Sequence, residues 1–145
     1  MKDNKPQTET VEFQGETREY DVWDKDFWAK DRRDAPRYWI MYDAQNSRVA
    51  ISNEVKQDYR PHMVFHELYE FEHNPDGPVK CLDALKTELT RLPEGELPYY
   101  IPFRTEVFRE LVKYWEKQTE GEPRDTILEG TRESLGYLED LRGGK

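Results

Sequence analysis

The three histidines of the chain all lie within one stretch of twelve residues, 62–73, which reads His-Met-Val-Phe-His-Glu-Leu-Tyr-Glu-Phe-Glu-His. The same stretch carries three glutamates, Glu67, Glu70 and Glu72. Imidazole nitrogens and carboxylate oxygens both bind zinc, and both can accept or donate protons in catalysis. The residues in this stretch are therefore the first candidates for chemistry.

A helix over residues 62–73 divides these side chains between two faces. At ~100° per residue, Val64, Leu68 and Phe71 form a narrow apolar stripe that can enter a core. The opposite side carries His62, His66, Glu70 and His73, with Tyr69 beside them. The pattern predicts a helix that buries its apolar stripe and presents its imidazole and carboxylate groups to a cleft.

His66 and Glu70 form the best-spaced pair of ligands. They are four residues apart, so on a helix both side chains project to one side and can share an ion. His73 is on the same face but lies seven residues from His66, about 10 Å along a helix. His62 precedes His66 by one turn, so a pair of His62 and His66 is a further alternative.

Residues 66–70, His-Glu-Leu-Tyr-Glu, resemble the His-Glu-x-x-His helix of the zincin metallopeptidases, with Glu70 in place of the second histidine. The resemblance covers roughly residues 37–92, where a hairpin precedes the helix and another helix follows it. It implies zinc as the cofactor, with His66 and Glu70 as ligands. It also implies that Glu67 is the general base that activates the attacking water.

A catalytic zinc site has a third protein ligand and one open position. The resemblance implies that this ligand comes from the next helix, where Glu88 lies at the edge of a leucine stripe and Asp83 points away from it. His73 is the rival candidate for the third position, and His62 is another.

Other motifs in the chain predict less. Glu70-x-x-His73 matches half of a di-iron carboxylate site, but the second half needs a fourth histidine, which the chain lacks. Cys81 could be a nucleophile beside a histidine, but as the only cysteine, on a leucine-rich helix, it is more typical of a buried apolar residue. The sequence contains no glycine-rich phosphate loop and no dinucleotide fingerprint.

Composition excludes several classes of function. The chain has 145 residues and a formal net charge of −9, which disfavours binding to nucleic acid or to anionic membranes. No apolar run approaches the ~20 residues of a membrane span, and the first ten residues lack the apolar centre of a signal peptide. With a single cysteine, no internal disulfide can form. These features together predict a cytoplasmic protein.

Hydrophobic periodicity and turn residues predict the elements that position the histidine stretch. We expect two β-hairpins, four helices, one aromatic segment that is a short helix or an irregular cover, and one loop. In chain order these are strands over 10–13 and 16–20, the aromatic segment at 22–28, strands over 37–42 and 48–52, helices over 61–73 and 78–92, a loop over 93–102, and helices over 105–118 and 125–141.

The predicted fold class is therefore α+β, with short antiparallel hairpins followed by about four helices and a zincin-like core. The length predicts a single domain over residues 1–145, with a flexible N-terminus of about eight residues. Two functions follow from the sequence. The first is a small metalloprotein, a zinc-dependent hydrolase of peptide or amide bonds. The alternative is a non-enzymatic acidic domain that binds a protein partner through the aromatic residues at 97–103 and has a degenerate or absent metal site.

Overall fold

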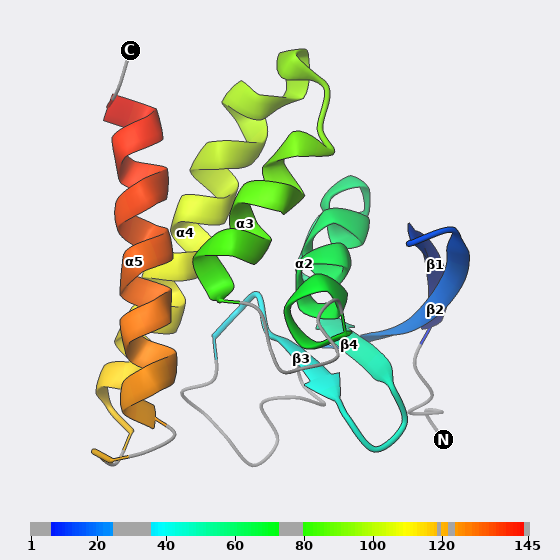
Figure 1. The fold of residues 1–145 in the computed structure, drawn as a ribbon, viewed down its shortest axis with the longest axis horizontal. Coiled ribbons are helices and arrows are strands. Elements are labelled where there is room, and N and C mark those ends of the chain that lie inside the picture. The colour runs from blue at the N-terminus through cyan, green and yellow to red at the C-terminus, as the bar shows by residue number, and fades with distance from the viewer. Residues whose placement is uncertain (1–6, 25–35, 73–79, 119, 122–123, 144–145) are drawn as a thin grey trace. The chain divides into compact units, whose positions relative to one another are not determined.

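The computed structural model describes residues 7–24, 36–72, 80–118, 120–121 and 124–143, and every structural statement below concerns these residues. The chain divides into two compact units, Met1–Val79 and Lys80–Lys145. The first unit holds a β-sheet and one α-helix, and the second holds three α-helices (Figure 1). The single domain expected over residues 1–145 stays a prediction.

The first unit is built on a four-stranded mixed sheet. Its strands are β1 (Gln7–Phe13), β2 (Glu16–Trp23), β3 (Ile40–Asp43) and β4 (Arg48–Ser52), in the spatial order β1-β2-β4-β3. Both predicted hairpins are confirmed, since β1 pairs with β2 and β3 pairs with β4, each in antiparallel fashion. The parallel pairing of β2 with β4, which joins the two hairpins, was not expected from the sequence.

The turn between β1 and β2 follows directly from its two residues. Gln14 and Gly15 both have positive φ angles, 50° and 81°, and connect the paired residues Phe13 and Glu16. A two-residue loop with positive φ at both positions has the twist that antiparallel strands require, and glycine adopts that conformation at little cost. The Gln14-Gly15 pair therefore fixes the register of the hairpin.

The helix that carries the candidate site packs on one face of this sheet. A 3-10 turn, η1 (Gln57–Tyr59), leads into α2 (Arg60–Glu72), which contacts β1, β3 and β4. The predicted helix over the histidine stretch is thus confirmed, as is its packing beside the second hairpin. Apolar side chains from both layers form the core of this unit: Val11, Phe13, Tyr20, Val22, Val49, Ile51, Met63, Val64 and Leu68.

The second unit consists of helices. Its elements are α3 (Cys81–Thr90), the 3-10 turn η2 (Glu94–Glu96), α4 (Leu97–Glu116) and α5 (Arg124–Gly143). Helix α5 packs against both α3 and α4 (Figure 1). The buried apolar residues of these three helices are Ala84, Leu85, Leu89, Tyr100, Val107, Phe108, Tyr114, Leu128 and Leu138.

Predicted and observed boundaries differ at the start of α4 and at the start of β3. The loop expected over 93–102 is wrong beyond Glu96, because α4 begins at Leu97 and runs through Pro102. Pro98 occupies the first turn, where a proline loses no helical hydrogen bond and its fixed φ suits the helix. Strand β3 begins at Ile40, three residues later than expected, because a turn precedes it.

The remaining sequence predictions fall partly outside the described residues. Of the aromatic segment at 22–28, Val22 and Trp23 belong to β2, and residues 25–28 are not described. Of the flexible N-terminus, Gln7 and Thr8 belong to β1, and residues 1–6 are not described. The α+β class itself is confirmed, with four sheet strands and four α-helices among the described residues.

Candidate metal site

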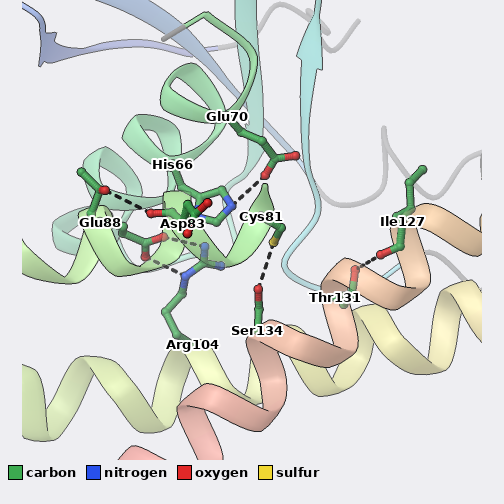
Figure 2. A network of polar contacts seen from close by, with 10 residues as sticks. His66, Glu70, Cys81, Asp83, Glu88, Arg104, Ile127, Thr131 and Ser134 are labelled. Carbon is green, nitrogen blue, oxygen red and sulfur yellow. Dashed lines mark hydrogen bonds and ion pairs between the residues drawn. The ribbon is translucent and has the colours of Figure 1, made fainter. Parts of the chain in front are cut away.

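The best-supported candidate site is the pair of His66 and Glu70 on α2. The Nε2 atom of His66 lies 3.0 Å from Oε1 of Glu70, one helical turn further on (Figure 2). Their side chains are 3% and 20% exposed, so the pair is shielded from bulk water but still open at the carboxylate. An imidazole nitrogen and a carboxylate oxygen this close together can ligate the same metal ion.

The environment of His66 differs from the sequence prediction. The sequence predicts His66 opposite the apolar stripe, on a side presented to a cleft, but His66 is buried together with Met63, Val64 and Leu68. At ~100° per residue, these four residues span an arc of about 200° around α2. The helix is therefore buried on more than one side.

Phe71 shows the opposite discrepancy. It was expected in the buried stripe, but it is 43% exposed. Its ring instead stacks on that of Tyr42 in β3, with the ring centroids 5.1 Å apart. At the end of the helix, Phe71 therefore contacts the sheet through this ring stacking and is not fully buried.

The start of α2 is held to the sheet by Arg60. The guanidinium of Arg60 donates hydrogen bonds to the carbonyl oxygens of Val55 and Asn53 and to the carboxylate of Glu9 in β1. The Glu9 carboxylate also accepts a hydrogen bond from the hydroxyl of Tyr20 in β2. The first turn of the helix is thus tied to both strands of the first hairpin.

The end of α2 is held by a second set of contacts, which centre on Glu72. Arg18 in β2 donates two hydrogen bonds to the two carboxylate oxygens of Glu72, at 2.7 and 2.8 Å. The hydroxyl of Tyr42 donates a third, at 2.6 Å. Hydrogen bonding from Arg18 holds the pKa of Glu72 below its ordinary value, while burial and the Glu72 carboxylate raise the pKa of Tyr42.

Glu88, the third ligand that the zincin resemblance implied, lies in the second unit and is fully buried. Arg104 donates hydrogen bonds to both of its carboxylate oxygens, at 2.7 and 2.8 Å (Figure 2). The hydroxyl of Tyr100 donates another to the same carboxylate. Burial, together with the neighbouring Glu88 charge, raises the pKa of Tyr100 well above its ordinary value. These bonds engage both carboxylate oxygens of Glu88, which is therefore not among the ligands proposed below.

The other candidates from the sequence have these positions. Glu67 directly follows His66 and is half-buried, and His62 is half-buried one turn before His66. His73 lies outside the described residues. Cys81, the only cysteine of the chain, has intermediate exposure at the start of α3, and its sulfur accepts a 3.2 Å hydrogen bond from the hydroxyl of Ser134 in α5 (Figure 2).

Two polar networks were missed at the sequence level. Arg18 and Glu72 are 54 residues apart, and Glu88 and Arg104 are 16 apart, so no local spacing rule pairs them. One signal was available for the first network. Helix α2 ends with several glutamates and no basic residue in its last turn, which is unfavourable at the negative end of the helix dipole. A cation from elsewhere in the fold was therefore to be expected there.

Comparison with protein-family models, with curated proteins and with solved structures finds no match to this chain. Among the described residues, no helix is both long enough and apolar enough to cross a membrane.

Proposed function

We propose that this chain is a metalloprotein that binds zinc through His66 and Glu70 of α2. The observation that carries the proposal is the 3.0 Å approach of the His66 imidazole to the Glu70 carboxylate within a largely buried turn of helix. A partly desolvated imidazole and carboxylate pair offers nitrogen and oxygen donors at the spacing of zincin helices. The helix end adds to the attraction, because its dipole and its glutamates favour a cation.

Zinc titration of tag-free, metal-free protein by calorimetry tests the binding proposal. We expect His66→Ala and Glu70→Ala each to weaken zinc binding about 100-fold or more, because loss of even an outer partner of a ligand costs about 10–100-fold. Asp83→Ala is the matched control, since Asp83 is an exposed carboxylate on α3. Equal affinity in all three variants would place the site elsewhere or exclude it.

Further ligands are found by the same titration. The variants His62→Ala, His73→Ala and Cys81→Ser, together with His66→Ala, cover every histidine and cysteine of the chain. Each side chain that ligates zinc lowers the affinity when removed, and a cysteine ligand also gives Co²⁺-loaded protein a thiolate charge-transfer band. A third protein ligand with one open position is the set that catalysis requires.

We further propose that the bound zinc serves the hydrolysis of a peptide or amide bond, with Glu67 as the general base. Zinc lowers the pKa of water and polarises carbonyl groups, which is the chemistry that this reaction needs. Glu67 lies about 100° around the helix from His66, so it is off the ligand side yet only one residue away. Its role is to take the proton from the attacking water.

Glu67→Gln separates this catalytic step from metal binding. The amide keeps the shape of the side chain and removes its basicity, so we expect a folded, zinc-loaded protein without activity. The measurement is a screen of peptide and amide substrates with the parent protein, followed by the variant. Full activity in the variant would exclude this mechanism, and no activity in the parent with any metal would leave zinc binding as the function.

A second candidate function, binding of a protein partner, is favoured by Tyr99. Its side chain is 72% exposed in the first turn of α4, directly after η2 with Glu94 and Glu96. Large aromatic side chains this exposed are typical of contact surfaces. Should the chain bind no zinc, crosslinking at Tyr99 in its native source would decide between partner binding and neither function.

A further inference from the structure

The C-terminal end of α2 is where the proposed metal ligands depend most on the rest of the fold. The final turn of a helix lacks internal partners for its last carbonyl groups and frays readily. Glu70 lies in that turn, whereas His66 lies one turn earlier in the buried part of the helix. Fraying of the last turn would therefore change the distance between the two ligands.

Two contacts from the sheet hold this turn in place. The guanidinium of Arg18 in β2 donates two hydrogen bonds to the Glu72 carboxylate, and it also donates a 2.9 Å hydrogen bond to the carbonyl oxygen of Ser47. Tyr42 of β3 donates to Glu72 through its hydroxyl and stacks its ring on Phe71. Both sides of the Arg18–Glu72 pair are about one-fifth exposed, and a two-pronged arginine contact of this kind is geometrically specific.

Charge gives the Arg18 contact a second effect. The last turn of α2 has no basic residue, although Glu70 and Glu72 both lie at the negative end of the helix dipole. Arg18 supplies the missing positive charge from a neighbouring strand. The negative end of the dipole disfavours the carboxylates of this turn, and the charge of Arg18 offsets that effect.

We propose that Arg18 is a positioning residue for the metal site, which holds Glu72 on the sheet and so keeps Glu70 at ligand distance from His66. This inference rests on the proposed zinc binding by His66 and Glu70. Arg18 touches neither ligand and acts through Glu72 and the helix backbone. Tyr42 supports the same turn through its hydroxyl and its ring.

The zinc affinity of Arg18→Met tests the proposal, since methionine keeps the aliphatic part of the side chain and removes the guanidinium group. We expect zinc binding about tenfold weaker, in line with the cost of losing an outer partner of a metal ligand. Arg18→Lys keeps the positive charge but cannot form the paired hydrogen bonds of a guanidinium, so we expect it to recover only part of the affinity. The Co²⁺ absorption spectrum should change in Arg18→Met, because altered ligand geometry changes metal-centred bands.

Arg48→Met is the matched control. Arg48 of β4 likewise donates two hydrogen bonds to the carboxylate of Asp21 in β2, at 2.8 and 2.9 Å, and its side chain is 35% exposed, compared with 20% for Arg18. Its loss removes a sheet contact of the same kind, but nothing at the end of α2. We expect its zinc affinity and Co²⁺ spectrum to match those of the parent protein, even where its stability is lower.

The outcomes separate the two proposals. Parent protein that binds zinc, with Arg18→Met binding it equally well, overturns the positioning role and leaves the metal site in place. Equal losses in Arg18→Met and Arg48→Met also overturn it, since the effect would then be one of general stability. If the parent binds no zinc, the proposed function and the metal half of this inference fall together. Hydrogen exchange at the amides of Phe71 and Glu72 then decides whether Arg18 holds the helix end: faster exchange in Arg18→Met supports that role, and unchanged exchange excludes it.

Discussion

Charged side chains that are buried in this protein remain charged because other side chains form hydrogen bonds and ion pairs with them. Glu88 is the clearest case, because its charge is fully buried and tolerated only through Arg104 and Tyr100. Such a pair contributes little net stability compared with apolar packing, but removing one partner leaves the other charge buried and alone.

Replacing Glu88 with alanine should therefore destabilise the protein strongly. The variant leaves the Arg104 guanidinium, 3% exposed, without its carboxylate partner. We expect a loss of about 3–5 kcal/mol in the free energy of unfolding, measured by urea denaturation. Asp83→Ala, exposed on the same helix, is the control and should change stability by less than about 0.5 kcal/mol. Similar values for the two variants would contradict the account of a closed buried network.

Because the hydroxyl of Tyr20 is buried, we expect the protein to lose stability at alkaline pH. Burial, with the hydrogen bond to Glu9, raises the pKa of Tyr20 above its ordinary value of 10.0. A group whose pKa is raised by folding stabilises the folded state fully below its unfolded pKa, and that contribution is lost as the pH rises above about 10. Tyr20→Phe cannot ionise, so its free energy of unfolding should fall less steeply between about pH 9 and pH 11 than that of the parent. Parallel curves for the two proteins would show that Tyr20 does not titrate in this way.

At the scale of elements, periodicity and turn residues were sufficient for most of the fold. The Gln14-Gly15 turn and the spacing of Val64 and Leu68 specified a hairpin and a helix that the structure contains. The i, i+4 rule also paired His66 with Glu70. Sequence failed where a contact depends on distant residues: the parallel pairing of β2 with β4, the Arg18–Glu72 contact and the Arg104 partner of Glu88 have no local pattern. The sequence prediction was also wrong at the start of α4, where Pro98 and Pro102 indicated a loop but lie within the helix.

Helix α4 provides a prediction that contrasts its two prolines. Pro102 lies inside the helix and has no N–H to donate to the carbonyl of Pro98, whereas Pro98 lies in the first turn, where that donor is not needed. Both side chains are exposed. We expect Pro102→Ala to raise the free energy of unfolding by about 1–3 kcal/mol, and Pro98→Ala to leave it nearly unchanged. Thermal denaturation followed by circular dichroism measures both, and equal shifts in the two variants would contradict the positional argument.

At the scale of the whole molecule, the sequence predicts one domain, while contacts within the chain group into Met1–Val79 and Lys80–Lys145. Cooperative unfolding distinguishes one domain from two. Trp39 is buried in the first unit, and Trp115 lies on α4 in the second. In variants that keep only Trp39 or only Trp115 of the four tryptophans of the chain, we expect fluorescence to report the same urea midpoint if the single-domain prediction holds. Two separate midpoints would show that the units unfold independently.

The parallel ladder between β2 and β4 also has a consequence for the order in which the chain folds. Each hairpin closes over a few residues, but Val22 and its partner Ile51 are 29 positions apart, and within the described part of the chain three residue pairs join the hairpins. Closing this longer loop costs entropy before any contact repays it, so the two hairpins should form early and their joining should limit the folding rate. In stopped-flow experiments, Val22→Ala should then slow refolding while unfolding stays nearly as fast as in the parent. A variant that instead accelerates unfolding at an unchanged refolding rate would place this central ladder after the rate-limiting step.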